Sequence, residues 1–145
     1  MTTLDASRVP RARETTPVSS LRQLVVADAV VTALTGWLLL VVSVDVAEWA
    51  GLTTAGPVRE VGAFFVVLAI ALAGLSRTSD GVLGRVVPVT AVGDLLWAVV
   101  SVVVALAADL TGAARALIVL QAVFVFAVGE AKLVLARRAR AAALS

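Results

Sequence analysis

The chain has 145 residues, of which 61% are hydrophobic and 15% are charged, with a formal net charge of +2 at pH 7. Its mean hydropathy of +1.04 excludes an ordinary water-soluble domain and places the chain among membrane proteins. His, Cys and Tyr are absent, and Met1 is the only methionine. This composition excludes disulfides, thiol catalysis, a histidine general base, a structural zinc site and ordinary haem ligation. We therefore expect no metal, no cofactor and no catalysis.

Residues 1–20 form a polar segment that is rich in Thr, Arg and Ser and includes Pro10 and Pro17. Such a segment cannot bury enough apolar surface to fold by itself, so we predict a disordered cytoplasmic tail. The hydrophobic run that follows is too long for a signal-peptide core, and no small-residue cleavage site precedes the next polar loop. We therefore predict that this run is retained as the first membrane span.

Four apolar segments reach or approach the length that crosses a membrane. A helix needs about 20 apolar residues to cross a hydrocarbon core of about 30 Å. The segments lack the apolar and polar alternation of membrane barrel strands. We therefore predict an all-α fold, a four-transmembrane-helix bundle over residues 21–138. Its helices are expected at about 24–46, 58–75, 86–108 and 113–136, and a second short tail at 139–145.

The basic residues are distributed unevenly about these spans. Ten lie on one side of the predicted membrane, namely Arg8, Arg11, Arg13, Arg22, Arg77, Arg85, Lys132, Arg137, Arg138 and Arg140, and only Arg59 and Arg115 lie on the other. The positive-inside rule then predicts an antiparallel bundle with both termini in the cytoplasm. Arg outnumbers Lys eleven to one, which fits a GC-rich bacterial genome and an inner-membrane location. Anionic lipid headgroups, and not nucleic acid, are the expected partner of these charges.

Three acidic residues interrupt the predicted spans: Asp28, Asp94 and Glu130. At 1.5 Å of rise per residue, each lies about 9 to 13 Å inside the predicted cytoplasmic boundary. An exposed charge at the bilayer centre costs about 2.5 to 3.5 kcal/mol, so such residues usually face the bundle interior or a wet cavity. The three acids are therefore candidate site residues.

Small and polar residues share a face with two of these acids. In the first span they follow Asp28 at helical spacing and include Gly36, and in the third span they include Asp94, Trp97 and Ser101. Small and hydroxyl residues at such spacings let membrane helices approach closely. We therefore predict that spans one and three pack through these faces, with Trp97 as a packing residue more than a ligand platform.

Two interpretations of Asp28 and Asp94 remain open. In the first, each is protonated or hydrogen-bonded and joins neighbouring helices, with Arg22 or Arg85 as the nearest basic partner. In the second, the pair is a proton-coupled or binding site, because acids inside membrane spans are functional candidates by default.

The remaining candidate residues lie in spans two and four. Gln121 and Glu130 are nine residues apart and so face opposite sides of span four, which means that one faces a second protomer or that Glu130 extends toward the headgroups. Arg59, Glu60 and Arg115 are charged residues of the predicted outer face.

Spans three and four resemble a known kind of protein. The phrase VGDLLWAVVSVVVAL, the Gln-Ala pair at 121–122, the nine-residue step to Glu130 and the closing KLVLARR are similar to a family of small four-helix bacterial integral membrane proteins, broadly like the DoxX-type bundles. That family is expected to have Asn-Leu-Leu-Trp where this chain has Asp94 to Trp97, and an Arg matched by Arg59. The resemblance covers about residues 21–138 and implies a fold without an established activity. The change from Asn to Asp argues against a role that needs a charge.

Three functional hypotheses follow from the sequence. The leading one is a non-catalytic, multi-pass inner-membrane bundle that binds a lipid, a quinone-like molecule or a membrane partner, which could be a second copy of the chain in a homo-oligomer or another membrane protein. The first alternative is a proton-coupled or small-solute transporter that uses Asp28 and Asp94. The second alternative is a subunit of a membrane redox or lipid-modifying enzyme.

Overall fold

A computed structural model describes residues 17–142 of the chain. The helices are α1 (Pro17–Val41), α2 (Ser43–Ala50), α3 (Gly56–Ser76), α4 (Asp80–Ala107) and α5 (Gly112–Ala142). All but the short α2 are long and apolar enough to cross a membrane. The predicted all-α fold with four long apolar helices is thus confirmed, and these are the helices of a multi-span membrane protein.

The boundaries differ from the predicted ones. The first span, expected at 24–46, is divided into α1 and α2, and the third span, expected to begin at 86, begins at Asp80. Both ends of the chain differ as well. Residues 17–20, which were expected in the tail, already belong to α1, because proline fits the first turn of a helix, where its missing N–H has no partner to lose. Residues 139–142 likewise continue α5. The remainder of the predicted tails, residues 1–16 and 143–145, lies outside the described residues.

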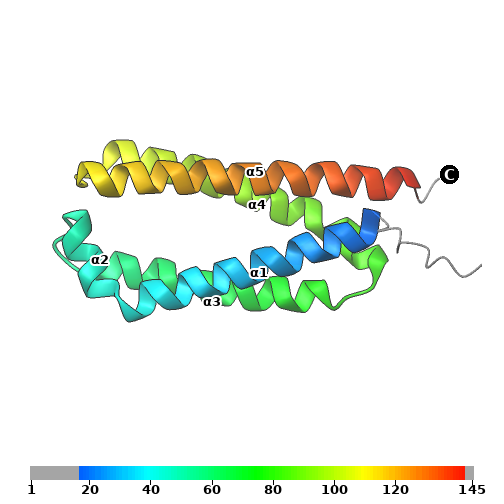
Figure 1. The fold of residues 1–145 in the computed structure, drawn as a ribbon, viewed down its shortest axis with the longest axis horizontal. Coiled ribbons are helices and arrows are strands. Elements are labelled where there is room, and N and C mark those ends of the chain that lie inside the picture. Colours follow the sequence, from blue (N-terminus) through cyan, green and yellow to red (C-terminus); the bar gives the residue numbers. More distant parts are fainter. Residues whose placement is uncertain (1–16, 143–145) are drawn as a thin grey trace, which may run out of the picture.

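The helices are arranged in two layers, each made of two antiparallel helices (Figure 1). One layer consists of α1 and α3, and the other of α4 and α5. The start of α1 and the end of α5 lie together at one end of the molecule, called the terminal end below, and α2 lies at the opposite end, called the α2 end. The prediction that spans one and three pack on each other is wrong as to the principal partner, since α1 packs mainly on α3 and α4 on α5, and α1 meets α4 at few positions.

A pair of glycines explains why α1 lies on α3. A Cβ atom added at Gly36 would lie 2.8 Å from the carbonyl oxygen of Gly62, and one added at Gly62 would lie 3.0 Å from the carbonyl oxygen of Gly36. The two backbones therefore touch at a point where no side chain fits. The small-residue face of α1 was correctly identified as a packing face, but its partner is α3.

The α2 end is closed by backbone hydrogen bonds. Helix α2 ends at Gly51, whose φ of 83° is open to glycine at little cost. The N–H of Thr111 donates to the carbonyl of Ala50 at 3.1 Å, and its hydroxyl donates to the carbonyl of Trp49 at 3.1 Å. The same hydroxyl accepts the N–H of Ala114 at 3.2 Å and so caps α5. Thr111 thus joins the two layers at this end.

At the terminal end the two layers meet in a hydrophobic cluster. Leu21 and Val25 of α1 pack there with Leu83 and Val87 of α4, and these four side chains are fully buried. Arg22 lies beside the cluster and donates to the carbonyls of Ser76 and Thr78 and to the carboxylate of Asp80. The guanidinium therefore holds the connection between α3 and α4, and does not reach Asp28 or Asp94.

Helix α4 contains a proline, Pro88, within its first half. Proline has no N–H, so it cannot donate to the carbonyl of Gly84 one turn earlier. The guanidinium of Arg140 donates to this carbonyl instead, at 3.3 Å. The last turn of α5 therefore replaces a hydrogen bond that α4 cannot make for itself.

Replacing Gly36 with alanine tests the contact between α1 and α3. The new Cβ would meet backbone atoms that cannot rotate away, and overpacking of this kind costs about 1 to 3 kcal/mol. The matched control is Gly93→Ala in α4, where a Cβ would meet nothing within 4 Å and alanine gains up to about 1 kcal/mol of helix propensity. Unfolding measurements in detergent should show that Gly36→Ala is less stable than the wild type and that Gly93→Ala is not. Equal stabilities would show that the glycine contact is not close in solution.

Candidate functional site

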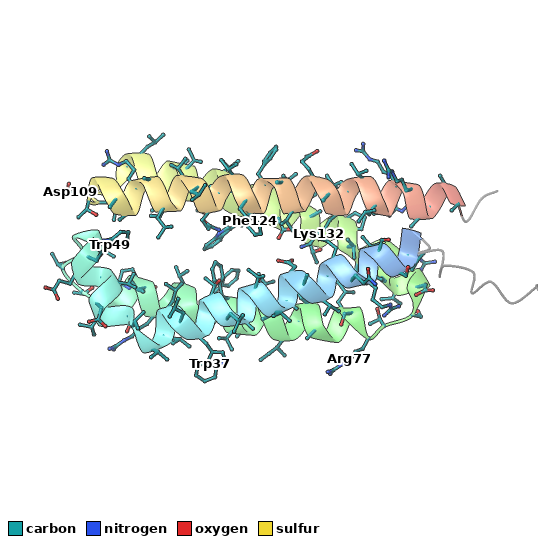
Figure 2. All side chains as sticks on the ribbon, in the orientation of Figure 1. Trp37, Trp49, Arg77, Asp109, Phe124 and Lys132 are labelled. Carbon is teal, nitrogen blue, oxygen red and sulfur yellow. The ribbon has the colours of Figure 1, made fainter. Side chains whose placement is uncertain are left out.

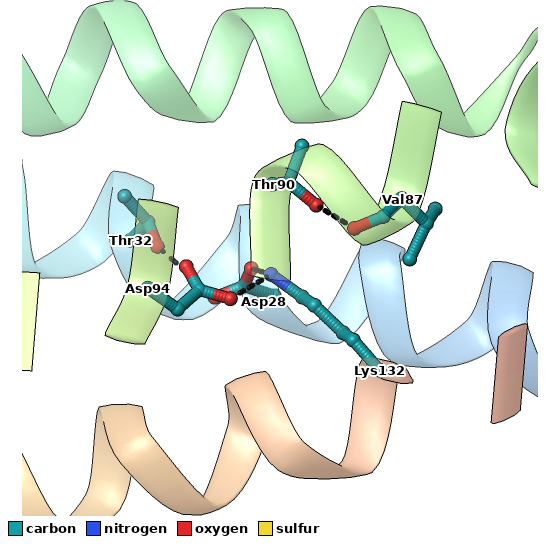
Figure 3. Close-up of polar contacts among 6 residues, drawn as sticks. All are labelled: Asp28, Thr32, Val87, Thr90, Asp94 and Lys132. Atoms are coloured by element: carbon teal, nitrogen blue, oxygen red, sulfur yellow. Dashed lines mark hydrogen bonds and ion pairs between the residues drawn. The ribbon is translucent and has the colours of Figure 1, made fainter. Parts of the chain in front are cut away.

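Three charged side chains from three helices meet between the two layers (Figure 3). The ammonium of Lys132 on α5 forms ion pairs with the carboxylates of Asp28 on α1 and, at 2.6 Å, of Asp94 on α4. We call these three residues the triad. The side chain of Lys132 is 0% exposed, and each aspartate side chain is 16% exposed. The ammonium is thus fully buried, while a small part of each aspartate side chain is exposed.

The local sequence explains how Lys132 reaches both acids. Gly129, one turn before Lys132, lies so close to α4 that an added Cβ would be 3.2 Å from the carbonyl oxygen of Ala91 and 3.2 Å from the Cβ of Asp94. This glycine brings the α5 backbone onto α4. On α1, the hydroxyl of Thr32 donates to Asp28 at 3.4 Å, from one turn further along the helix.

The triad is unbalanced in charge. When both carboxylates are ionised, two negative charges face one positive charge, and a net negative charge remains among apolar helices. A net charge in a medium of low dielectric constant is expensive unless it is paired. Uptake of one proton by either carboxylate makes the triad neutral. The ammonium can then form an ion pair with the carboxylate that stays ionised. The triad therefore contains one acidic group more than it contains basic groups.

Lys132 is the site residue that the sequence analysis missed. It was counted among the basic residues that mark the cytoplasmic ends of the helices, and Arg22 or Arg85 was expected beside the acids. Arg22 instead pairs with Asp80, and Arg85 is exposed. A long side chain five residues before Arg137 still lies at the depth of the acids. Lys132 is the only lysine among twelve basic residues, and this difference was the signal in the sequence that could have identified it.

An aromatic cluster lies one turn further along α4. The indole of Trp97 stacks on the ring of Phe64, with a centroid distance of 5.6 Å and an interplanar angle of 20°, and meets the ring of Phe65 edge-on at 5.1 Å. Its Nε1 is buried and has no hydrogen-bond partner in the described part of the chain. Trp97 therefore packs α4 against α3 on the same face of α4 as Asp94.

The other predicted site residues lie apart from the triad. Glu130 is exposed and Gln121 is partly buried, and no hydrogen bond or ion pair between described residues joins either one to Lys132. Arg59 donates to the buried hydroxyl of Ser43 at 3.0 Å near the α2 end. Glu60 and Arg115 are exposed. The structure brings together Asp28 and Asp94, and it adds Lys132.

Comparisons with models of protein families, with curated proteins and with solved structures give no match. The resemblance to DoxX-type bundles therefore stays a prediction.

A double-mutant cycle tests whether one ammonium serves both acids. Asp28→Asn and Asp94→Asn each leave a neutral pair of one carboxylate and one ammonium, so each should change the free energy of unfolding by no more than about 1 kcal/mol. The double variant leaves Lys132 buried without a counter-charge, which typically costs about 3 to 5 kcal/mol. Unfolding in detergent should therefore show strong non-additivity. A double variant whose loss equals the sum of the two single losses would contradict the shared ammonium.

Proposed function

We propose that the chain is a multi-pass protein of the bacterial inner membrane with both termini in the cytoplasm. Charge at the two ends of the bundle supports this orientation. The terminal end carries Arg22, Arg77, Arg85, Arg137, Arg138 and Arg140, whereas the α2 end carries Asp45, Glu48, Glu60 and Asp109 beside Arg59 and Arg115. Removing Lys132 from the count leaves the basic residues strongly biased toward the terminal end, which the positive-inside rule assigns to the cytoplasm.

The absence of cysteine makes the orientation easy to test, because a single introduced cysteine is the only thiol. Thr53 lies between α2 and α3, Ser79 lies between α3 and α4, and both are exposed. An impermeant thiol reagent applied to intact cells should label Thr53→Cys and should leave Ser79→Cys unlabelled until the cells are opened. The reverse pattern would place the termini outside.

The function that the geometry supports best is that of a non-catalytic, proton-coupled membrane protein, with the triad as its proton site. The observation that carries this proposal is the excess of one carboxylate over the single enclosed ammonium. Acids and their partners inside membrane spans mark proton relays in pumps and transporters. Both carboxylates are slightly exposed whereas Lys132 is fully buried, which makes the carboxylates the more accessible members of the triad.

The position of the triad links its proton to the contact between the layers. With the proton on Asp94, the ammonium serves Asp28 and ties the α4 and α5 layer to α1. With the proton on Asp28, the ammonium serves Asp94, which lies in the same layer as Lys132, and the tie to α1 is released. Any ligand that binds more tightly to the tied or to the released arrangement would therefore couple to the proton.

Infrared spectroscopy of the protein in lipid tests for the retained proton. The wild type should show the C=O band of a protonated carboxylic acid at neutral pH. Both Asp28→Asn and Asp94→Asn should lose this band, because the remaining acid and Lys132 already balance. Glu130→Gln is the matched control, since it removes an acid of similar depth outside the triad and should keep the band.

Transport by the same variants tests the coupling. In proteoliposomes under an imposed pH gradient, proton flux should be lost in both aspartate variants and kept in Glu130→Gln. A wild type without the acid band, or aspartate variants with unchanged flux, would contradict the proposal.

A second candidate function is lipid binding, which an apolar groove favours. The groove runs between α1 and α3 and has a volume of about 600 Å³, within the range of about 300 to 1,000 Å³ that is usual for ligand sites. A smaller apolar groove of about 350 Å³ lies between α4 and α5. A bundle can bind lipid there and exchange a proton at the triad, so the two functions are compatible.

A further inference from the structure

The groove between α1 and α3 is formed by small residues at a spacing of four. Ala29 and Ala33 line it from α1, and Ala69 and Ala73 line it from α3. The next position in each series carries a large side chain, Trp37 on α1 and Arg77 on α3. Positions four apart lie on one face of a helix, so the alanines form the floor of the groove. Because the helices are antiparallel, Trp37 and Arg77 lie toward opposite ends of it.

The groove has the length of one membrane leaflet. Its lining on α3 extends from Val66 to Arg77, which is about 16 Å at 1.5 Å of rise per residue. The hydrocarbon core is about 30 Å thick, so one leaflet supplies about half of that distance. The groove thus begins near the middle of α3 and ends at the terminal end of the bundle.

Arg77 lies at the end of the groove that is nearest the terminal end of the bundle, where lipid headgroups are expected. Arg77 is exposed, and no acidic side chain of residues 17–142 lies within ion-pair distance of it. Arg22, in contrast, is held by Asp80. Figure 2 shows the side chains of Trp37 and Arg77 pointing away from the layer of α4 and α5, on the outer side of their own layer. The groove therefore opens toward the surrounding lipid.

We propose that this groove binds an anionic phospholipid of the leaflet at the terminal end. One acyl chain lies over the alanine floor, and the phosphate of the headgroup meets the guanidinium of Arg77. Three observations support this occupant: an apolar floor, a length of one leaflet, and an arginine at the terminal end that has no acidic partner among residues 17–142. The inference deepens the second candidate function and does not depend on the proton site.

Native mass spectrometry from detergent tests the proposal with an equimolar mixture of phosphatidylglycerol and phosphatidylcholine that carry the same chains. The wild type should retain one lipid and prefer phosphatidylglycerol about fivefold, as expected for one basic residue at the membrane surface. Arg77→Gln should retain the lipid without the preference. Ala33→Phe fills the floor and should retain neither lipid. Arg85→Gln removes an exposed arginine of the same end that does not line the groove, and it should behave as the wild type.

The results that overturn the proposal are equally specific. The proposed contact between the headgroup and Arg77 is contradicted if Arg77→Gln keeps the fivefold preference, or if Arg85→Gln loses as much of it as Arg77→Gln does. The chain contact is wrong when a folded Ala33→Phe, checked by its detergent unfolding, keeps the lipid. Inorganic phosphate without lipid should not raise the thermal stability of the wild type above that of Arg77→Gln. A rise of that kind would show an ion site in place of a lipid site.

Discussion

The shared ammonium of Lys132 is the interaction on which the middle of the bundle depends. It lies where α1, α4 and α5 come together, and it is the only side chain that forms ion pairs with both layers among the described residues. Elsewhere each layer is held within itself by close helix contact. The two layers also meet through the hydrophobic cluster and the Arg22–Asp80 ion pair at the terminal end, through the packing of Trp97 on α3, and through Thr111 at the α2 end. The strength of an ion-pair contact depends on the charges of its groups, whereas the packing of apolar side chains does not.

Glycine positions determine which helices lie close together. Gly36 and Gly62 bring α1 onto α3, and Gly129 brings α5 onto α4 beside Asp94. In a membrane the lipid chains are as apolar as leucine, so close packing and polar contacts must supply the association that water supplies elsewhere. The glycines bring the helices together within each layer, and the ion pairs of the triad connect one layer to the other. The fold and the site thus have the same origin, because the close approach at Gly129 is also what places Lys132 within reach of Asp94.

The sequence predicted the four helices because hydrophobic length and the lack of alternation are local signals. It also predicted that Asp28 and Asp94 lie at similar depth, since depth follows from counting residues along a helix. The pairing of helices and the position of Lys132 depend on how one helix is rotated against another, and a single amphipathic face does not state its partner. Gly36 shows this limit: its face was recognised, but the choice of α3 over α4 required the matching glycine at 62. Lys132 was hidden because a basic residue near a helix end has an ordinary explanation in the positive-inside rule.

The burial of Lys132 has a consequence for how substitutions at this position are judged. Every other basic residue of the chain is arginine, so an exchange of lysine for arginine would look conservative in a list of sequences. A guanidinium is planar, keeps its proton and binds carboxylates side by side, whereas an ammonium is a compact charge with three donors that can face two acids at once. Lys132 is fully buried and its ammonium faces two acids, an arrangement that suits the compact charge. Arginine at this position would therefore meet the two acids with a different geometry, even where the rest of the helix is the same.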